Sequence, residues 1–211
     1  MSRLVTVRSA LLCSSLVLGC VERPPAAPPP GASTEVESCG ALAPPSAYQG
    51  EYMRRQSLEA TFEKEIFRFS AILQKQGDTL LVVGLSPFGT REFALLQDGA
   101  TFTVDGSGAR HLPFNPRLIL EDIHHAYFET IGGEPPSEGT RAGRIGTCNL
   151  VEEWNAGGLV EKRFSSASGA PLRTIRYERP APQGHALSRI FLRDHRYGYT
   201  LTIDTVSDDA L

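Results

Sequence analysis

Residues 65–105 decide the fold, and they read EIFRFSAILQKQGDTLLVVGLSPFGTREFALLQDGATFTVD. In the first part of this stretch apolar and polar side chains alternate, which is the period of a strand with one buried face. Turn signals then separate the apolar runs: Gly77-Asp78, Ser86-Pro87-Phe88-Gly89 and Asp98-Gly99. The pattern predicts an antiparallel meander over residues 50–105, with strands from residue 65 and at residues 79–85, 91–96 and 101–104.

The second of these strands, residues 79–85, is apolar on both faces. A strand of this kind needs a cover on each side. We therefore expect one face to meet a helix or to line an apolar cavity, and the other face to pack elsewhere in the protein.

A helix is predicted after the meander, over residues 115–128. Asn115 suits the N-cap and Pro116 the first helical position, and apolar residues follow at helical spacing. A loop rich in glycine and proline is expected over residues 132–146. Strand-like segments then return at residues 145–154, 159–164, 172–178, 187–192 and 197–206.

The expected fold class is mainly β with a helical insertion (α+β). About nine or ten antiparallel strands interrupted by one helix predict a curved sheet, or half-barrel, around that helix. With 211 residues, 41% of them hydrophobic, the chain is long enough for one globular domain and is not disordered throughout. The net charge of −3 gives no electrostatic footprint for nucleic acid, which is excluded as a partner.

The first residues have the pattern of an export signal. Arg3 and Arg8 precede an apolar run that ends at Cys20, and this run is too short to cross a bilayer, which needs about 20 residues. Residues 17–20, Val-Leu-Gly-Cys, resemble the bacterial lipobox, which implies that Cys20 is acylated and holds the protein at a membrane. The alternative is a secretory signal without lipid and a chance cysteine.

The predicted organisation follows from that signal. Residues 1–19 form the lipoprotein signal peptide, residues 20–47 the acylated cysteine and a proline-rich tether, and residues 48–211 a single half-barrel domain. Val21 stands where many lipoproteins retained in the inner membrane have Asp. The resemblance therefore implies a lipid-anchored protein of the outer membrane that faces the periplasm.

Two cysteines, Cys39 and Cys148, remain in the predicted mature domain. In an oxidising compartment we expect them to form a disulfide, which is worth about 4 to 5 kcal/mol in the chain-entropy model for a loop of about 110 residues. A buried thiol beside an exposed one is the alternative, as is a metal site, although neither cysteine lies in a CxxC motif or near clustered histidines.

No catalytic motif was found, so we expect neither an enzyme nor a cofactor nor a metal centre. Glu121 and His125 lie one helical turn apart and present two ligands, which do not make a metal site. Their expected role is solvation of the helix or ordinary hydrogen bonding. The histidines outside the helix are not placed near this pair by any pattern: His111, His185 and His195.

Phe88 stands at the tip of a predicted turn, next to Pro87. An exposed phenylalanine forgoes about 2 kcal/mol of burial, and such exposure often marks a contact with a membrane or a partner. The alternative is that Phe88 folds back onto the sheet.

Three segments resemble an uncharacterised family of bacterial lipoproteins often encoded beside aryl polyene biosynthesis genes: residues 83–99, 118–127 and 197–204. That family is similar to the LolA/LolB lipoprotein carriers, whose fold is an open half-barrel with an apolar cavity. Pro87-Phe88-Gly89 matches the Pro-Leu-Gly turn of LolB, with Phe88 in place of the protruding leucine, which implies a membrane contact for Pro87 and Phe88.

The function expected from residues and resemblance together is that of an outer-membrane lipoprotein which binds or transfers a lipid, an acyl chain or a lipoprotein, with a periplasmic carrier as a possible partner. The candidate lining of its cavity is Phe67, Phe69, Leu73, Leu80, Val82 and Leu120. The alternative is a packed, non-carrier adaptor for an envelope biosynthesis or export complex. A cavity of several hundred Å³ favours the carrier, and a packed interior favours the adaptor.

Overall fold

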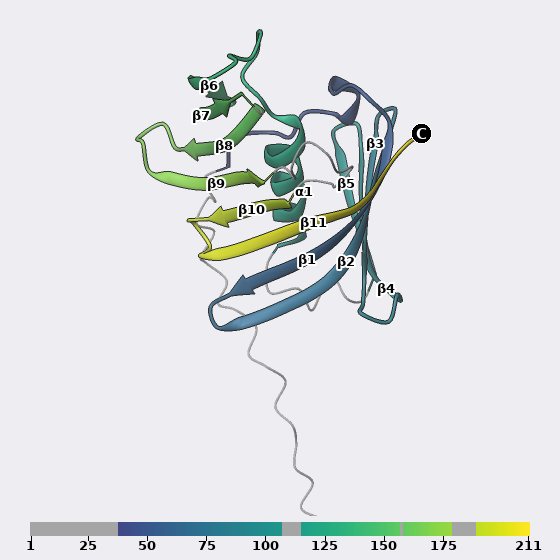
Figure 1. Cartoon of the computed structure of the whole chain (residues 1–211). Helices are drawn as coiled ribbons and strands as arrows, with labels where there is room; N and C mark the ends of the chain where they lie inside the picture. Colours follow the sequence, from purple (N-terminus) through teal and green to yellow (C-terminus); the bar gives the residue numbers. More distant parts are fainter. Residues whose placement is uncertain (1–37, 107–114, 157, 179–188) are drawn as a thin grey trace, which may run out of the picture. The chain divides into compact units, whose positions relative to one another are not determined.

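A computed structural model describes residues 38–106, 115–156, 158–178 and 189–211 (Figure 1). The predicted signal peptide, Cys20, most of the predicted tether, His111 and His185 lie outside the described residues. Among the described residues, no helix is long and apolar enough to cross a membrane.

The described strands form one antiparallel sheet in the order β5-β4-β3-β2-β1-β11-β10-β9-β8-β7-β6. It consists of two meanders, β1 to β5 and β6 to β11, and the pairing of β1 with β11 joins them. The strands are β1 (Tyr52–Phe62), β2 (Glu65–Gln76), β3 (Thr79–Leu85), β4 (Arg91–Asp98), β5 (Thr101–Asp105), β6 (Gly139–Ile145), β7 (Cys148–Asn155), β8 (Gly158–Ser165), β9 (Pro171–Glu178), β10 (Arg189–Asp194) and β11 (Tyr199–Ala210).

The predicted helix forms α1 (Pro116–Ile123) and continues as a π-helical segment, η3 (His124–Phe128). Asn115 is the N-cap, and its side chain accepts a hydrogen bond of 2.9 Å from the backbone N–H of Arg117. This cap satisfies one of the free N–H groups at the helix start, as the sequence predicts. A short 3₁₀ helix, η1 (Pro45–Ala47), precedes β1.

The core lies between α1 and one face of the sheet, here called the inner face (Figure 1). Leu120 and Ile123 of α1 pack with residues of β2, β3 and β4. Ala126, one turn further along, packs with residues of β7 to β11. Since one helix contacts both meanders, the sheet curves around it, and the predicted fold class is confirmed.

Three parts of the chain differ from expectation. The predicted loop over residues 132–146 contains β6, an edge strand whose pairing with β7 outweighs its weak sequence pattern. Residues 38–47, expected as the end of the tether, pack on the domain through the Cys39–Cys148 disulfide and hydrogen bonds from Ser46 to Asp78. The outer face of β3 is covered less than predicted, because Leu81, Val83 and Leu85 stay only half-buried.

Candidate functional site

An apolar cavity lies between α1 and the inner face of the sheet. Its volume is about 40 Å³. Nearly all of its wall is apolar, and the residues come from β1, β2, β3, β4, β11 and the helix: Gln56, Leu58, Ala60, Phe69, Ala71, Val82, Phe93, Ile119, Asp122, Ile123, Tyr127, Tyr199, Leu201 and Ile203.

The six residues predicted to line a cavity all belong to this part of the protein. Phe69 and Val82 are in the wall. The other four are not among the wall residues: Leu73, Leu80 and Leu120 are buried in the adjoining core, and Phe67 is half-buried further along β2. Several wall residues are themselves only half-buried, so the cavity has an apolar rim: Leu58, Phe69, Ile119 and Leu201.

The volume of the cavity limits what it holds in this conformation. Pockets for small ligands are typically about 300–1,000 Å³, and a space of about 10–15 Å³ already holds a water. The cavity therefore has room for a few waters, and an acyl chain enters only if the helix and part of the sheet separate.

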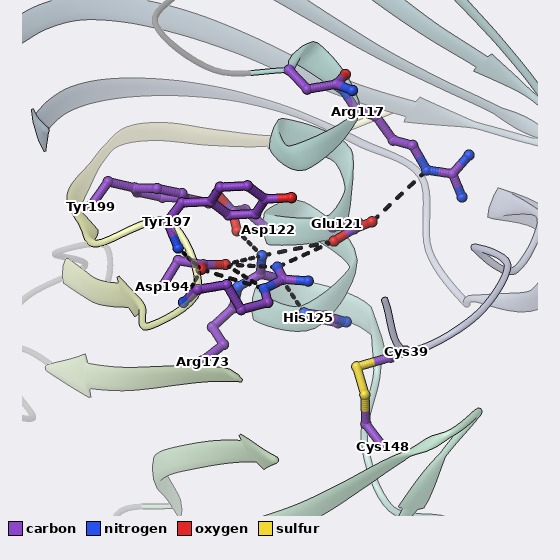
Figure 2. A network of polar contacts seen from close by, with 12 residues as sticks. Cys39, Arg117, Glu121, Asp122, His125, Cys148, Arg173, Asp194, Tyr197 and Tyr199 are labelled. Carbon is purple, nitrogen blue, oxygen red and sulfur yellow. Dashed lines mark hydrogen bonds and ion pairs between the residues drawn. A yellow bond between two sulfur atoms is a disulfide. The ribbon is translucent and has the colours of Figure 1, made fainter. Parts of the chain in front are cut away.

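A buried ionic cluster attaches α1 to the C-terminal meander (Figure 2). Arg173 of β9 is completely buried, and its Nη2 lies 2.9 Å from Asp122 Oδ1 and 2.8 Å from Asp194 Oδ2. Arg196 adds contacts of 2.7 Å to Asp194 and 3.4 Å to Glu121. Paired charges of this kind tolerate burial, whereas an isolated one is very costly.

The carboxyl groups of this cluster differ in their pKa. Burial raises the pKa of Asp122 to about 6, although Arg173 and a 2.7 Å hydrogen bond from Tyr199 oppose the rise. Asp194 is also buried, but hydrogen bonds from Arg196 and the charge of Arg173 lower its pKa overall. Of these two aspartates, Asp122 therefore titrates nearer to neutral pH.

His125 is held as a neutral ring in the same region. Burial, with Arg173 as the next cause, lowers its pKa well below the usual value. The Arg173 guanidinium donates to His125 Nδ1, and since arginine only donates, the ring proton is on Nε2, which lies 3.1 Å from Glu129 Oε2. Among the described residues no group of His, Cys, Asp or Glu is arranged to hold a metal ion.

A second set of polar contacts ends the helix. Lys162 Nζ donates to the carbonyl oxygens of His125 and Glu129, at 3.0 and 2.5 Å. Burial lowers the pKa of Lys162 to about 8 and raises the pKa of Glu129 to about 7. Tyr177 also donates to a carbonyl of this segment, that of Ala126, at 2.7 Å. These contacts satisfy carbonyls that the π-helical turn leaves free.

The helix contacts the N-terminal meander differently. Its hydrogen bonds there join neutral groups, His124 Nε2 to Gln97 Oε1 at 2.7 Å and Gln56 Nε2 to Tyr127 Oη at 2.6 Å. The Arg54 guanidinium of β1 also lies over the Tyr127 ring, 5.1 Å from its centre. Burial lowers the pKa of His124 to about 4, so this histidine is neutral at physiological pH. The helix is thus joined to β9 and β10 by ionic contacts and to β1–β4 mainly by apolar packing.

Sequence reasoning missed this cluster. It placed Glu121 and His125 on a solvated helix face or in ordinary hydrogen bonds, yet both are buried, at 4% and 3% exposure. The sequence did contain one signal. In a strand, Arg173 faces the same side as Ile175 and Tyr177, so the pattern places a charge on an otherwise apolar face.

Phe88 lies at the tip of the turn between β3 and β4 and is 94% exposed. Ser86 supports this turn, because its hydroxyl accepts hydrogen bonds of 3.2 Å from the backbone N–H groups of Phe88 and Thr90. Pro87 is exposed as well. The phenyl ring therefore does not fold back onto the sheet.

Cys39 and Cys148 form a disulfide, and both are buried. The bond joins the segment before β1 to the start of β7. Thr147 adds a backbone hydrogen bond of 3.0 Å to the carbonyl of Cys39. The segment that contains Ala41 and Leu42 is thereby held near Glu121, His125 and Glu129, with which it lines a small pocket of about 70 Å³.

Comparison with known proteins identifies a family. The family described as "Protein of unknown function (DUF3261)" matches residues 53–207. Similar solved structures include a LolA superfamily protein from Nitrosomonas europaea (14% identity, TM-score 0.46, 77% of this chain and 87% of that one). A putative outer membrane lipoprotein-sorting protein domain from Vibrio parahaemolyticus (12%, 0.44, 76% and 85%) and a DUF1329 family protein from Desulfovibrio piger (12%, 0.39, 79% and 87%) are also similar. No curated protein matches.

Proposed function

The chain belongs to the DUF3261 family, and from the geometry above we propose that it binds an acyl chain or a similar apolar group between α1 and the inner face of its sheet. The apolar wall of the cavity carries this proposal. The half-buried rim residues Phe69 and Ile119 supply an apolar entrance, and the polar groups in the wall, Gln56 and Asp122, already have partners in Tyr127 and Tyr199.

Energetics favour such a site for transfer. Burying about 14 methylenes gains roughly 11 kcal/mol relative to water, at about 0.8 kcal/mol each, against an association cost of about 4 to 15 kcal/mol. Relative to a bilayer the same burial is nearly neutral, because lipid is equally apolar. A protein that delivers its cargo to a membrane needs an affinity for the cargo close to that of the bilayer. A cavity that closes when empty binds less tightly than an open one, because part of the binding free energy is used to open it.

The unequal attachment of α1 gives the cavity a way to open. On the N-terminal side, ligand entry exchanges apolar packing of Leu120 and Ile123 for apolar contact with the ligand. The hydrogen bonds lost there are few, chiefly those of His124 and Tyr127. On the other side, separation would take Asp122 and Glu121 of the helix away from Arg173 and Arg196, at a cost of several kcal/mol because Asp122 would lose its cation. The N-terminal meander is therefore the side that moves.

Membrane contact is assigned to Pro87 and Phe88, whose exposed tip inserts an apolar ring into the bilayer surface. An acyl group on Cys20 would anchor the protein, at the periplasmic face of the outer membrane in this proposal. The cargo is then a lipid or the acyl end of a lipoprotein, received from a periplasmic carrier protein. The role is one of binding and transfer, without catalysis.

The second candidate is a packed adaptor for an envelope biosynthesis or export complex. The small volume of the cavity, about 40 Å³, favours it, as does the partly exposed apolar outer face of β3 and β4. In that case Phe88 contacts a protein and not a membrane.

Lipid extraction tests the two candidates. The full chain is purified and extracted with organic solvent, and non-covalently bound lipid is identified by mass spectrometry; binding of a fluorescent fatty acid is measured in parallel. The carrier predicts about one acyl species per protein, or saturable probe binding. An empty protein that binds no probe would leave the adaptor as the function.

A matched pair of variants locates the site. Leu58→Trp fills the cavity from the inner face of β1 and should weaken probe binding at least about tenfold, a loss slightly smaller than that from exposing two buried methylenes. Ile72→Trp places the same bulk on the outer face of β2 and should leave binding unchanged. Circular dichroism confirms that both variants are folded. Equal binding by both would place the probe outside this cavity.

A further inference from the structure

A second hollow lies on the outer face of the sheet, opposite α1, over β9, β10 and β11. Its volume is about 410 Å³, within the range of about 300–1,000 Å³ typical of small-molecule sites. The outward side chains that line it are Thr174 and Arg176 of β9, Phe191 and Arg193 of β10, His195, and Thr200 and Thr202 of β11. Half of this wall is polar, unlike the cavity under the helix.

Strand register explains the shape of the hollow. Phe191 pairs with Arg176 on one side and Thr202 on the other, and Arg193 pairs with Thr174 and Thr200. Arg193 thus has a short threonine on each side, and Phe191 has a threonine on one side and an arginine on the other. The hollow therefore has threonine hydroxyls at its base, and an aromatic ring and two guanidinium groups rise around them.

The charge of the hollow is not balanced. Arg176 pairs with Glu161 through Nε at 2.6 Å. Arg189, the outward residue of β10 that precedes Phe191, pairs with Asp204. Arg193 has no ion pair or hydrogen bond with any residue that the structure describes, and its cross-strand neighbours are uncharged threonines. An exposed cation thus stands at the centre of a concave surface with no acidic partner of its own.

We propose that this hollow binds a saccharide that carries a phosphate or carboxylate group. The Arg193 guanidinium offers paired donors to the anion, and such charge-assisted hydrogen bonds are stronger than neutral ones. The ring of Phe191, 36% exposed, gives a flat apolar surface for the C–H face of a sugar ring. The hydroxyls of Thr174, Thr200 and Thr202 accept from and donate to sugar hydroxyls. A purely apolar ligand matches none of these polar groups.

Rigid placement supports a built site. Each lining residue except His195 is on a strand paired on both sides, and His195 is fixed by a backbone hydrogen bond to Leu172 (2.9 Å) and a side-chain contact to Thr174 (3.1 Å). Groups on strands keep their geometry better than groups on loops. Leu201 of β11 borders both this hollow and the cavity under α1. The side chains assigned to the saccharide are all absent from the cavity wall, so the site stands or fails independently of the proposed acyl binding.

NMR titration of the full chain tests the proposal, with glucose 6-phosphate, glucuronate, glucose and inorganic phosphate as probes. We expect the two anionic sugars to shift backbone amides of β9, β10 and β11. Glucose and inorganic phosphate should each bind at least about tenfold more weakly, since each offers only part of the chemistry. The tighter of the two anionic sugars identifies the anionic group. Inorganic phosphate binding as tightly as glucose 6-phosphate would overturn the saccharide assignment.

Three variants sharpen the test. Arg193→Gln should weaken binding of glucose 6-phosphate at least about tenfold, and Phe191→Ala several-fold. Arg91→Gln removes an exposed arginine of β4, far from the hollow, and should change nothing. Leu58→Trp, which fills the inner cavity, should also leave sugar binding unchanged. Absence of shifts at millimolar sugar, shifts elsewhere, or equal affinity of the Arg193 and Arg91 variants would refute the site.

Discussion

Arg173→Met is the change that most directly tests how the helix is held. Methionine keeps an apolar stem in the space of the arginine side chain but removes the guanidinium. That group lies 2.9 Å from Asp122 and 2.8 Å from Asp194, and it also donates to His125. Arg196 still contacts Asp194 in the variant, so Asp122 is the carboxylate that loses its cation.

The expected loss of unfolding free energy at about pH 7.5 is roughly 3–5 kcal/mol, the range for a buried ion pair that loses one partner. The loss depends on pH in a defined direction. Arg173 lowers the pKa of Asp122, which burial nevertheless raises to about 6, so its removal raises the folded-state pKa further. At pH values between the Asp122 pKa of the wild type and the higher Asp122 pKa of the variant, the folded variant binds more protons than the folded wild type. The deficit should therefore shrink by roughly 1 kcal/mol or more as pH falls to about 5.

Urea unfolding followed by circular dichroism at both pH values measures this. Arg189→Met, which removes an arginine from the exposed pair with Asp204, is the control and should change stability little. An Arg173 variant as stable as the control at pH 7.5, or a deficit that grows towards acid pH, would refute the assignment of Arg173 as the residue that compensates the helix carboxylates.

Four further changes test other parts of the structure. Burial raises the pKa of Glu129 from 4.5 to about 7, so the folded protein favours the neutral carboxyl and loses stability as pH rises from about 4.5 to 7. In Glu129→Gln this loss is absent, so over the same pH range the free energy of unfolding of the variant should rise by up to about 3 kcal/mol relative to wild type, as measured by urea titrations. Replacing Cys39 and Cys148 by alanine, which opens a link across 109 residues, should cost about 4–5 kcal/mol, and a reductant should reduce wild type to the same stability. Gly84→Ala would place its Cβ 2.3 Å from the Phe93 ring and should cost about 1–3 kcal/mol in thermal unfolding, whereas Gly132→Ala, with nothing within 4 Å, should not. Phe88→Ser should leave the melting temperature unchanged and reduce co-sedimentation with lipid vesicles several-fold; unchanged co-sedimentation would contradict the membrane contact.

The N-terminal meander and the helix start could be predicted because their signals are local. Alternation over residues 65–74 and the glycine turns at Gly77 and Gly99 specify strands and hairpins without reference to the rest of the chain, and both glycines have positive φ. The cap at Asn115 is equally local. For β6 the local signal was weak, because Gly139, Gly143 and two arginines dilute the alternation, and only the partner strand β7 makes the segment a strand.

The surroundings of the helix could not be predicted from local patterns. Whether Glu121, Asp122 and His125 face water depends on which strands curve over them, and their partners Arg173 and Asp194 come from β9 and β10, far along the chain. A charged residue on the apolar face of a strand, such as Arg173, indicates that a buried partner of opposite charge exists, but it does not identify that partner. For Phe88 the sequence left two alternatives, a ring exposed at the turn tip or a ring folded back onto the sheet, and the structure has the exposed ring.

The sheet order has a consequence for how the protein acquires its structure. The first and last strands of the domain, β1 and β11, lie at the centre of the sheet, with Tyr52 opposite Ala210, while the edges β5 and β6 come from the middle of the chain. The central ladder thus has the greatest sequence separation in the fold, which raises contact order and slows folding. A chain that emerges from its amino end cannot complete this ladder until β11 has been synthesised. Until then β1 lacks one of its two partner strands and is open to other chains, and loss of β11 would divide the sheet and not merely shorten it.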